Sequence, residues 1–470
     1  MAEKERRDFS PQDISDEIER LNRNSRQVIW NCDENLSFDL VIPPTVYPPR
    51  EDTDLIAQQI ISLGDGNGRK ALEIGCGSGA LSMLLCAKGW LVSACDINPY
   101  AVAASRGNLA VSGFDANIVE CGPGSHNRTW LQKKPFDLII WNLPYLERPA
   151  PDTELLGPLE EASLIDLENE GVMELLANSI TCEHLLTVEG KALIVHQSDN
   201  DVQLICHRWG LAARTKATRE FIEGANIQVT CIWRPWSKSP LDRIHTTTST
   251  NEDLLSLDLP VGSHLTAKIQ TSGRGRKGRH WRSADGCYAG SWVISTGEKV
   301  DAGILQLAAG LAVIDAIRCF GDIPLQLKWP NDILIGKRKV CGILAESRIK
   351  GNDMRAVIGI GINLKNDAEV LTENEAAIDE YIELTPEQID LTLHASLASL
   401  LERKPSLPPL DNEGIILRAL ERIKSLGDLF YRGEVCTVHS IANDGKLILT
   451  SGDELIEIDD GEAIEWLSLR

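Results

Sequence analysis

Hydrophobic and polar positions follow two different periods in the first half of the chain. Short apolar runs predict strands at residues 71–74, 91–95, 136–141, 192–195 and 227–233, with the last one at a sheet edge. Stretches of helical periodicity lie between them and predict helices at residues 81–87, 99–112 and 172–186. Strands that alternate with helices favour a parallel sheet flanked by helices.

Two breaks in this pattern divide the chain. The proline-containing segments 234–240 and 403–409 read as linkers. After the second break, a helix is predicted at residues 411–425, followed by strands at 434–439, 446–450 and 454–458 and a hairpin turn at 443–445. We therefore expect four parts: a charged segment 1–25, a domain 26–236, a domain 237–410 and a domain 411–470.

Composition narrows the possible partners. The chain has 470 residues, room for two or three domains, and its formal net charge is −22. That charge argues against nonspecific binding to duplex nucleic acid or to an anionic membrane surface. The twelve cysteines are scattered without a C-x-x-C pair, which disfavours structural zinc or a disulfide framework. With no membrane-length apolar run and no secretory signal, we expect a cytoplasmic protein.

A glycine turn, Glu73-Ile74-Gly75-Cys76-Gly77-Ser78-Gly79, joins the first strand to the first helix. Its glycines let the backbone approach a ligand, and the helix N-terminus that follows favours negative charge. Asp96 ends the next strand, where its carboxylate could accept both hydroxyls of a ribose or could cap the helix that begins near Pro99.

Asn142-Leu143-Pro144-Tyr145 follows the strand at 136–141, where it could also be an ordinary turn at the end of a strand. It resembles the N-P-P-Y motif of methyltransferases that act on amide or amine nitrogen. In that motif the Asn side chain and the next carbonyl accept hydrogen bonds from the target NH₂, while the aromatic ring stacks on the planar group. Here Leu143 replaces a proline.

Together these segments, across residues 40–200, resemble a class I S-adenosylmethionine methyltransferase with a Rossmann-like α/β fold. Residues 46–53 resemble the entry segment of release-factor glutamine methyltransferases, whereas residues 146–170 are acidic where such enzymes are often glycine-rich. The resemblance implies S-adenosylmethionine as methyl donor and an unidentified acceptor, a protein or small molecule in preference to nucleic-acid adenine. A non-catalytic binding module is the alternative. The implied donor-binding residues are Glu73, Gly75, Cys76, Gly77, Gly79, Asp96, Ile97 and Asn142; the implied acceptor-binding residues are Asn142, Leu143, Pro144 and Tyr145.

The second half carries a basic glycine loop at residues 273–281, GRGRKGRHW, and a KWPND segment at 328–332. Four cations on a flexible backbone suit a loop that closes over phosphates, and a solvated basic turn is the alternative. The second segment places a lysine, an amide and a carboxylate within five residues, and its proline keeps it out of a helix.

With residues 249–251, Gln270, 342–346 and 359–363, these segments occur in the order typical of a biotin protein ligase, and this half resembles that family. The resemblance implies an α+β catalytic domain followed by a small SH3-like β-barrel. It implies that ATP, Mg²⁺ and biotin give biotinyl-5′-AMP, and that biotin passes to a lysine of a biotin carboxyl carrier protein or carboxylase carrier domain. No helix-turn-helix is evident before the ligase segments, so we expect no DNA operator. A lipoyl or octanoyl ligase is the alternative.

The implied roles fall on named side chains. Lys328 would stabilise charge between the biotin carboxylate and the α-phosphate, and Arg274 and Arg276 would cover the phosphates. Asn331 and Asp332 could hold Lys328 or coordinate Mg²⁺. Ser249 and Thr250 could equally cap a helix, Trp281 could be core, and Gly342, Gly359 and Gly361 are expected to serve backbone packing. The full biotin- and ATP-binding set is Ser249, Thr250, Asn251, Gln270, Gly273, Arg274, Gly275, Arg276, Arg279, Trp281, Lys328, Asn331 and Asp332.

Overall fold

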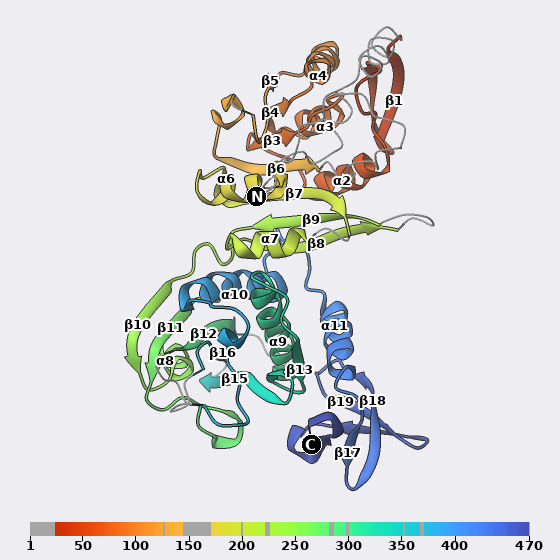
Figure 1. The fold of residues 1–470 in the computed structure, drawn as a ribbon. Helices are drawn as coiled ribbons and strands as arrows, with labels where there is room; N and C mark the ends of the chain where they lie inside the picture. The colour runs from red at the N-terminus through yellow and green to blue at the C-terminus, as the bar shows by residue number, and fades with distance from the viewer. Residues whose placement is uncertain are drawn as a thin grey trace, which may run out of the picture. The chain divides into compact units, whose positions relative to one another are not determined.

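The structure, a computed structural model, describes residues 24–125, 127–143, 171–198, 201–220, 226–281, 286–297, 300–350, 353–366 and 371–469. The chain forms two compact units (Figure 1). The first unit comprises Met1–Ile205 and Ala213–Arg234, and the second comprises Cys206–Ala212 and Pro235–Arg470. Among the described residues, no helix combines the length and the apolar composition needed to cross a bilayer.

A seven-stranded sheet organises the first unit. Its strands, in spatial order, are β5 (Asn117–Glu120), β4 (Leu91–Asp96), β3 (Lys70–Ile74), β6 (Phe136–Asn142), β7 (Leu186–Gln197), β9 (Ile227–Trp233) and β8 (Ala212–Arg219). The strands from β5 to β7 are parallel, and β9 pairs antiparallel to β7. The described helices of this unit are α2 (Glu51–Ser62), α3 (Ala80–Ala87), α4 (Pro99–Val111) and α6 (Val172–Thr181), and α7 (Val202–Arg208) crosses the boundary between the two units. Successive buried residues in β3, β4 and β6 show that both sheet faces are covered, as parallel sheets require.

Two sequence predictions for this unit were wrong. The helix predicted at 172–186 ends at Thr181, because His184 adopts a left-handed backbone (φ 54°) before β7 begins. The strand 227–233 is not at the edge, since β8 lies beyond it. β8 reads AARTKATR, and its many polar residues hid it from the apolar pattern. A separate hairpin, β1 (Arg26–Asp33) with β2 (Leu36–Ile42), was also not predicted.

The second unit is built on another seven-stranded sheet. Its order is β10 (Leu241–Thr247), β11 (His264–Gln270), β12 (Cys287–Thr296), β16 (Asp353–Asn363), β15 (Arg338–Lys350), β14 (Asp332–Ile335) and β13 (Leu325–Lys328). Only β10 and β11 pair in parallel among these neighbours. Three helices accompany the sheet: α8 (Thr250–Ser256), α9 (Ala302–Arg318) and α10 (Pro386–Leu401), of which α9 and α10 pack side by side (Figure 1). Nearly every residue of α9 is buried, so this helix forms the centre of the core.

The end of the chain forms α11 (Asn412–Lys424) and a five-stranded sheet. Its order is β20 (Glu454–Ile458), β19 (Leu447–Ser451), β18 (Glu434–Ile441), β17 (Leu429–Tyr431) and β21 (Ile464–Trp466). The predicted helix and three strands are therefore confirmed, within a few residues. The finer prediction, an SH3-like barrel, is not confirmed, because within the described residues the strand order ends at β20 and β21 without a pairing between them.

Candidate active sites

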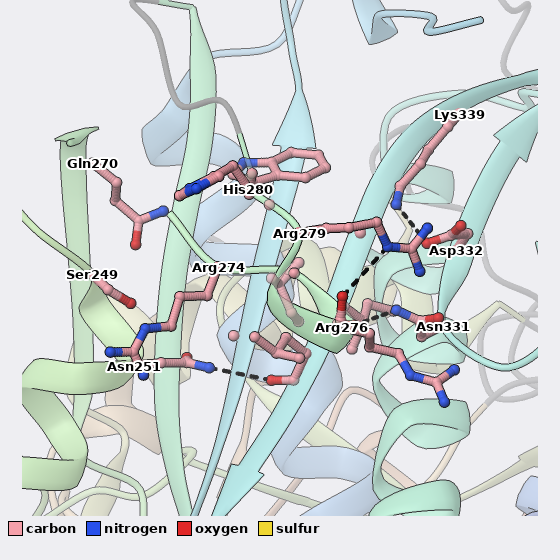
Figure 2. Close-up of a pocket in the computed structure, with 18 of the residues that line it drawn as sticks. Ser249, Asn251, Gln270, Arg274, Arg276, Arg279, His280, Asn331, Asp332 and Lys339 are labelled. Atoms are coloured by element: carbon pink, nitrogen blue, oxygen red, sulfur yellow. Dashed lines mark hydrogen bonds and ion pairs between the residues drawn. The ribbon is translucent and has the colours of Figure 1, made fainter. Parts of the chain in front are cut away.

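A cavity of about 270 Å³ lies on the sheet of the second unit (Figure 2). Figure 2 shows Ser249, Asn251, Gln270 and Arg274 on one side of it and Asn331, Asp332 and Lys339 on the other. The residues predicted from sequence that line it are Ser249, Thr250, Asn251, Gln270, Arg274, Gly275, Arg276, Arg279, Trp281, Asn331 and Asp332. The structure thus brings together segments that lie more than 80 residues apart in the chain. Gly273 and Lys328 do not line this cavity.

The start of α8 supplies one wall through a chain of hydrogen bonds. The Thr250 hydroxyl lies 3.1 Å from Gln270 Oε1, which accepts from it, and 2.6 Å from Ser291 Oγ. Ser291 in turn donates to Asn251 Oδ1 at 2.7 Å, and Asn251 Nδ2 donates to the Glu346 carboxylate at 2.8 Å. These side chains are buried or half-buried, so they form a preorganised polar surface.

Ser249 occupies the N-cap position of α8, but its hydroxyl makes no capping hydrogen bond. It lines the cavity instead. Ser249 is therefore the N-cap residue of α8 by its backbone position only. Its hydroxyl does not cap the helix and is available to the cavity.

The basic loop folds back on itself at the mouth of the cavity. Gly275 N–H donates to Arg279 O at 2.7 Å, and Lys277 and Gly278 both have left-handed backbone (φ 55° and 75°), which glycine adopts without strain. The loop cations already face carboxylates: Arg274 Nη1 lies 3.0 Å from Glu252 Oε2, and Arg279 Nη2 lies 3.0 Å from Glu462 Oε1. The loop is therefore positioned to exchange these carboxylates for another anion.

In the first unit, a hydrogen bond links the glycine turn to the Asp96 side chain. Gly75, Gly77 and Gly79 all have positive φ (71°, 51° and 81°), which explains why glycine occupies these positions. The Asp96 carboxylate accepts from Gly77 N–H and from Asn98 N–H, both at 2.9 Å, and burial raises its pKa above the usual range. The N-cap of α4 is Asn98, whose side chain accepts from Tyr100 N–H, so Asp96 is not the helix cap.

The other residues predicted to bind the methyl donor differ in solvent exposure. Glu73 is buried beneath the turn, where it accepts a hydrogen bond from Ser82 and where burial raises its pKa to about 8. Cys76 is also buried and accepts from the Ser105 hydroxyl. Ile97, by contrast, is 46% exposed and can offer an apolar surface to a ligand.

Asn142 ends β6 at the same sheet edge as the glycine turn, since Ile74 of β3 pairs with Trp141. Its Nδ2 donates to Asp52 Oδ2 at 2.8 Å. Leu143 is buried, and its N–H donates to Val195 O. Pro144 and Tyr145 lie outside the described residues. The carboxyl ends of β3, β4 and β6 thus carry the turn, Asp96 and Asn142, which is where ligands bind in open α/β sheets.

The geometry agrees with comparisons to known proteins. Residues 241–363 match the family model of the biotin/lipoate A/B protein ligase family, and residues 51–202 match that of the methyltransferase small domain. The chain carries a biotin/lipoate ligase domain and a small methyltransferase domain.

Relatives of the ligase domain include the biotin–[acetyl-CoA-carboxylase] ligase of Paracoccus denitrificans, 41% identical over 124 residues, which are 25% of this chain and 52% of that protein. The bifunctional ligase/repressor BirA of Escherichia coli is 33% identical over 174 residues, 36% of this chain and 53% of that protein. The chain thus spans about half the length of these two relatives. The structure of the Aquifex aeolicus biotin protein ligase in complex with biotin and ATP is 25% identical, with a TM-score of 0.42 over 48% of this chain and 99% of that one.

Three glycines of the ligase domain leave room for pocket side chains. A Cβ on Gly359 would lie 2.3 Å from Asn251 Oδ1, and one on Gly361 would lie 2.3 Å from Trp281 Cε2. Gly342 likewise faces the Trp281 ring. All three line the cavity, so they pack against its walls and also shape it. The spacing of Gly359 and Gly361 in the sequence could have indicated that both line the cavity, because alternate residues of a strand face the same side.

The two tryptophans near the ligase motifs have different environments. The Trp281 ring lines the cavity, and its buried Nε1 has no hydrogen-bond partner within the described structure. Trp329 is 2% exposed, and its Nε1 donates to Gly445 O at 2.9 Å. Trp329 is therefore core, and Trp281 is a wall of the cavity.

Lys328 lies beside the main cavity in a smaller one of about 70 Å³, which Arg276, Arg279, Asn331 and Asp332 also line.

The polar side chains of Asn331 and Asp332 both have partners. Asn331 Nδ2 donates to Ile343 O at 2.7 Å. Asp332 Oδ1 lies 2.6 Å from Lys339 Nζ, so the structure pairs this carboxylate with a lysine that sequence analysis missed. The hairpin between β14 and β15 returns Lys339 to the pocket side, and no local sequence pattern signals this register.

Proposed function

We propose that this chain is a bifunctional enzyme. Residues 237–410 would join biotin to AMP and pass it to a lysine of a carboxylase carrier domain, with residues 411–470 as an associated small barrel. Residues 26–236 would transfer a methyl group from S-adenosylmethionine to a nitrogen. The observation that carries the ligase assignment is the single cavity formed by Asn251, Gln270, the basic loop and Asn331–Asp332. The names of the ligase relatives support the same choice.

The ligase chemistry requires two displacements. The biotin carboxylate attacks the α-phosphorus of ATP and pyrophosphate leaves; then the acceptor lysine attacks the acyl carbon and AMP leaves. Arg274, Arg276 and Lys328 would offset the negative charge that gathers as two anions meet. Mg²⁺ bound to ATP commonly uses one or two carboxylates besides the phosphates, and Asp332, which lines the cavity, would supply one of them.

The polar wall of the cavity favours biotin over lipoate. The ureido ring of biotin both donates and accepts hydrogen bonds, and Ser249, Thr250 and Gln270 present hydroxyl and amide groups to the cavity. The apolar dithiolane ring of lipoate would offer no hydrogen bond to the Ser249 hydroxyl, which makes no capping bond and lines the cavity, and an unpaired polar group costs free energy. We therefore propose biotin as the acyl substrate.

The methyltransferase assignment depends on the carboxyl ends of β3, β4 and β6, which carry the glycine turn, Asp96 and Asn142. The turn and Asp96 would hold S-adenosylmethionine, which supplies an electrophilic methyl group when it is bound. Ile97 would contact the donor through its exposed side chain.

Both halves can be tested with the full chain. Radiolabelled biotin or lipoate is incubated with ATP and a carboxylase carrier domain, and transfer is measured; preferential transfer of lipoate would refute the choice of biotin. Titration calorimetry with S-adenosylmethionine, followed by mass spectrometry of cell extract incubated with labelled methyl donor, tests the first half. Absence of donor binding would leave a non-catalytic module as the better description.

A further inference from the structure

The amide of Asn142 has a fixed orientation in the methyltransferase domain. Its Nδ2 lies 2.8 Å from Asp52 Oδ2. A carboxylate can only accept hydrogen bonds, so the NH₂ group of Asn142 must face Asp52 and the carbonyl oxygen must face the other way. This Oδ1 atom is buried and has no hydrogen-bond partner among the described residues.

Asp52 is itself held firmly. It is 3% exposed and lies in the first turn of α2, where the helix dipole favours a negative charge. Its Oδ1 accepts from Thr53 N–H at 2.6 Å and from the Thr53 hydroxyl at 3.2 Å. Its Oδ2 accepts from the Tyr47 hydroxyl at 3.1 Å in addition to Asn142. The carboxylate is thus a firmly held acceptor, and one of these four hydrogen bonds sets the Asn142 amide.

A buried carbonyl oxygen without a donor is unfavourable, because it has lost its hydrogen bonds to water and gained none in return. Such an oxygen in a native structure needs a reason, and a substrate that brings the missing donor is one. Asn142 ends β6 at the edge where the glycine turn and Asp96 lie, so the empty acceptor belongs to the candidate methyl-transfer site.

We infer that Asp52 is a positioning residue for methyl transfer: it orients Asn142 so that Oδ1 accepts a hydrogen bond from an N–H of the methyl acceptor. This inference depends on the proposed methyltransferase activity and narrows its substrate to a nitrogen that carries hydrogen. The hydrogen bond turns the nitrogen lone pair toward the methyl group. The nitrogen then attacks the methyl carbon, the carbon–sulfur bond breaks, sulfur keeps the electron pair as S-adenosylhomocysteine forms, and the nitrogen releases its proton to water.

The isosteric change Asp52→Asn tests this orientation without removing packing. Two donors of Thr53 face the Oδ1 position, so the new amide oxygen should take that place and its NH₂ should face Asn142. The Asn142 amide would then rotate to offer its oxygen to residue 52 and its NH₂ to the substrate. The NH₂ of Asn142 would then face the N–H of the substrate. Two hydrogen-bond donors facing each other disfavour binding in the reactive orientation.

The experiment uses the full chain, saturating labelled S-adenosylmethionine and cell extract, and follows the initial rate for the most strongly labelled peptide. We expect Asp52→Asn to lower this rate about 10- to 100-fold, a loss comparable to removing an aligned hydrogen bond at a reacting group. The dissociation constant of S-adenosylmethionine, measured by calorimetry, should change less than about twofold, because Asp52 acts through the acceptor. Glu51→Gln, the loss of an exposed carboxylate one residue earlier, should keep the wild-type rate.

A double variant separates positioning from a general structural effect. If Asp52 acts only through Asn142, then Asp52→Asn combined with Asn142→Ala should be no slower than Asn142→Ala alone. Multiplied losses, or a rate for Asp52→Asn equal to that of Glu51→Gln, would overturn the inference. Donor binding without any labelling by the wild-type chain would instead overturn the proposed methyltransferase activity, and the inference with it.

Discussion

Lys339 Nζ lies 2.6 Å from Asp332 Oδ1 on the wall of the ligase cavity. The same ammonium lies 5.7 Å from the centroid of the Trp281 ring, so one cation pairs with a carboxylate and lies over an aromatic wall of the pocket. A cation held in this way can leave its carboxylate for an incoming acyl carboxylate or phosphate.

We predict that Lys339→Met lowers the rate of biotinyl-adenylate formation about 10- to 100-fold, because a cation beside the reacting anions is lost. Methionine keeps the length of the side chain. Pyrophosphate release measures the rate, and Lys337→Met, an exposed lysine of the same hairpin, is the matched control. Equal rates for the two variants would contradict a role for Lys339.

Lys328→Ala should have a larger effect. Lys328 lines the adjoining cavity with Arg276 and Arg279, and in the proposed reaction it would contact the nucleotide. Its loss should raise the barrier to adenylate formation by roughly 3 kcal/mol, while the fold survives. Pyrophosphate release again gives the rate, and circular dichroism checks the fold. An unchanged rate in a folded variant would remove Lys328 from the mechanism.

The two cavities show which of their lining residues a local sequence motif indicates and which it does not. Thr250, Gln270 and Asn331 could be predicted because each lies in a short local motif. Lys339 could not, because its position depends on the register between β14 and β15, which no local pattern fixes. Asp52 was also missed as a functional residue, since its partner Asn142 is 90 residues away in the chain.

The secondary structure also contains elements that the sequence pattern predicted and elements that it missed. The strands β3, β4 and β6 could be predicted from apolar runs, because parallel strands are buried on both faces. Helix α9 was missed, since a helix buried all round has no polar face and therefore no helical periodicity. β8 was missed for the opposite reason, because its polar residues resemble a loop.

Gly361 offers a test of the shape of the cavity. A Cβ at this position would lie 2.3 Å from the Trp281 ring, so Gly361→Ala should push the ring into the cavity. We predict at least a tenfold loss of biotin affinity, measured by calorimetry. Gly107→Ala is the control, because a Cβ there meets nothing within 4 Å. Biotin binding that is the same in both variants would show that Trp281 does not shape the biotin site.

Two buried histidines should make the stability of the ligase domain depend on pH. The His264 ring stacks on Trp292 with centroids 4.1 Å apart, and His394 Nδ1 accepts from Trp292 Nε1 at 3.0 Å. Burial lowers the pKa of both histidines to about 3; the Arg243 charge further lowers that of His264, while Asp390 opposes the shift for His394. In the folded state, these rings therefore stay neutral down to pH values at which a solvated histidine is charged.

The sign of the pH effect follows from proton binding. Between pH 6.5 and about 3 the unfolded histidines bind protons that the folded ones do not, so stability falls as pH falls through this window and is fully present above 6.5. At pH 5 each histidine should cost about 2 kcal/mol of stability. We predict that His394→Gln flattens the pH dependence of the unfolding transition followed through tryptophan fluorescence, because glutamine can still accept from Trp292 but does not titrate. His245→Gln, at an exposed histidine, should leave the slope as in the wild type, and an equal slope in all three proteins would rule out His394 as its source.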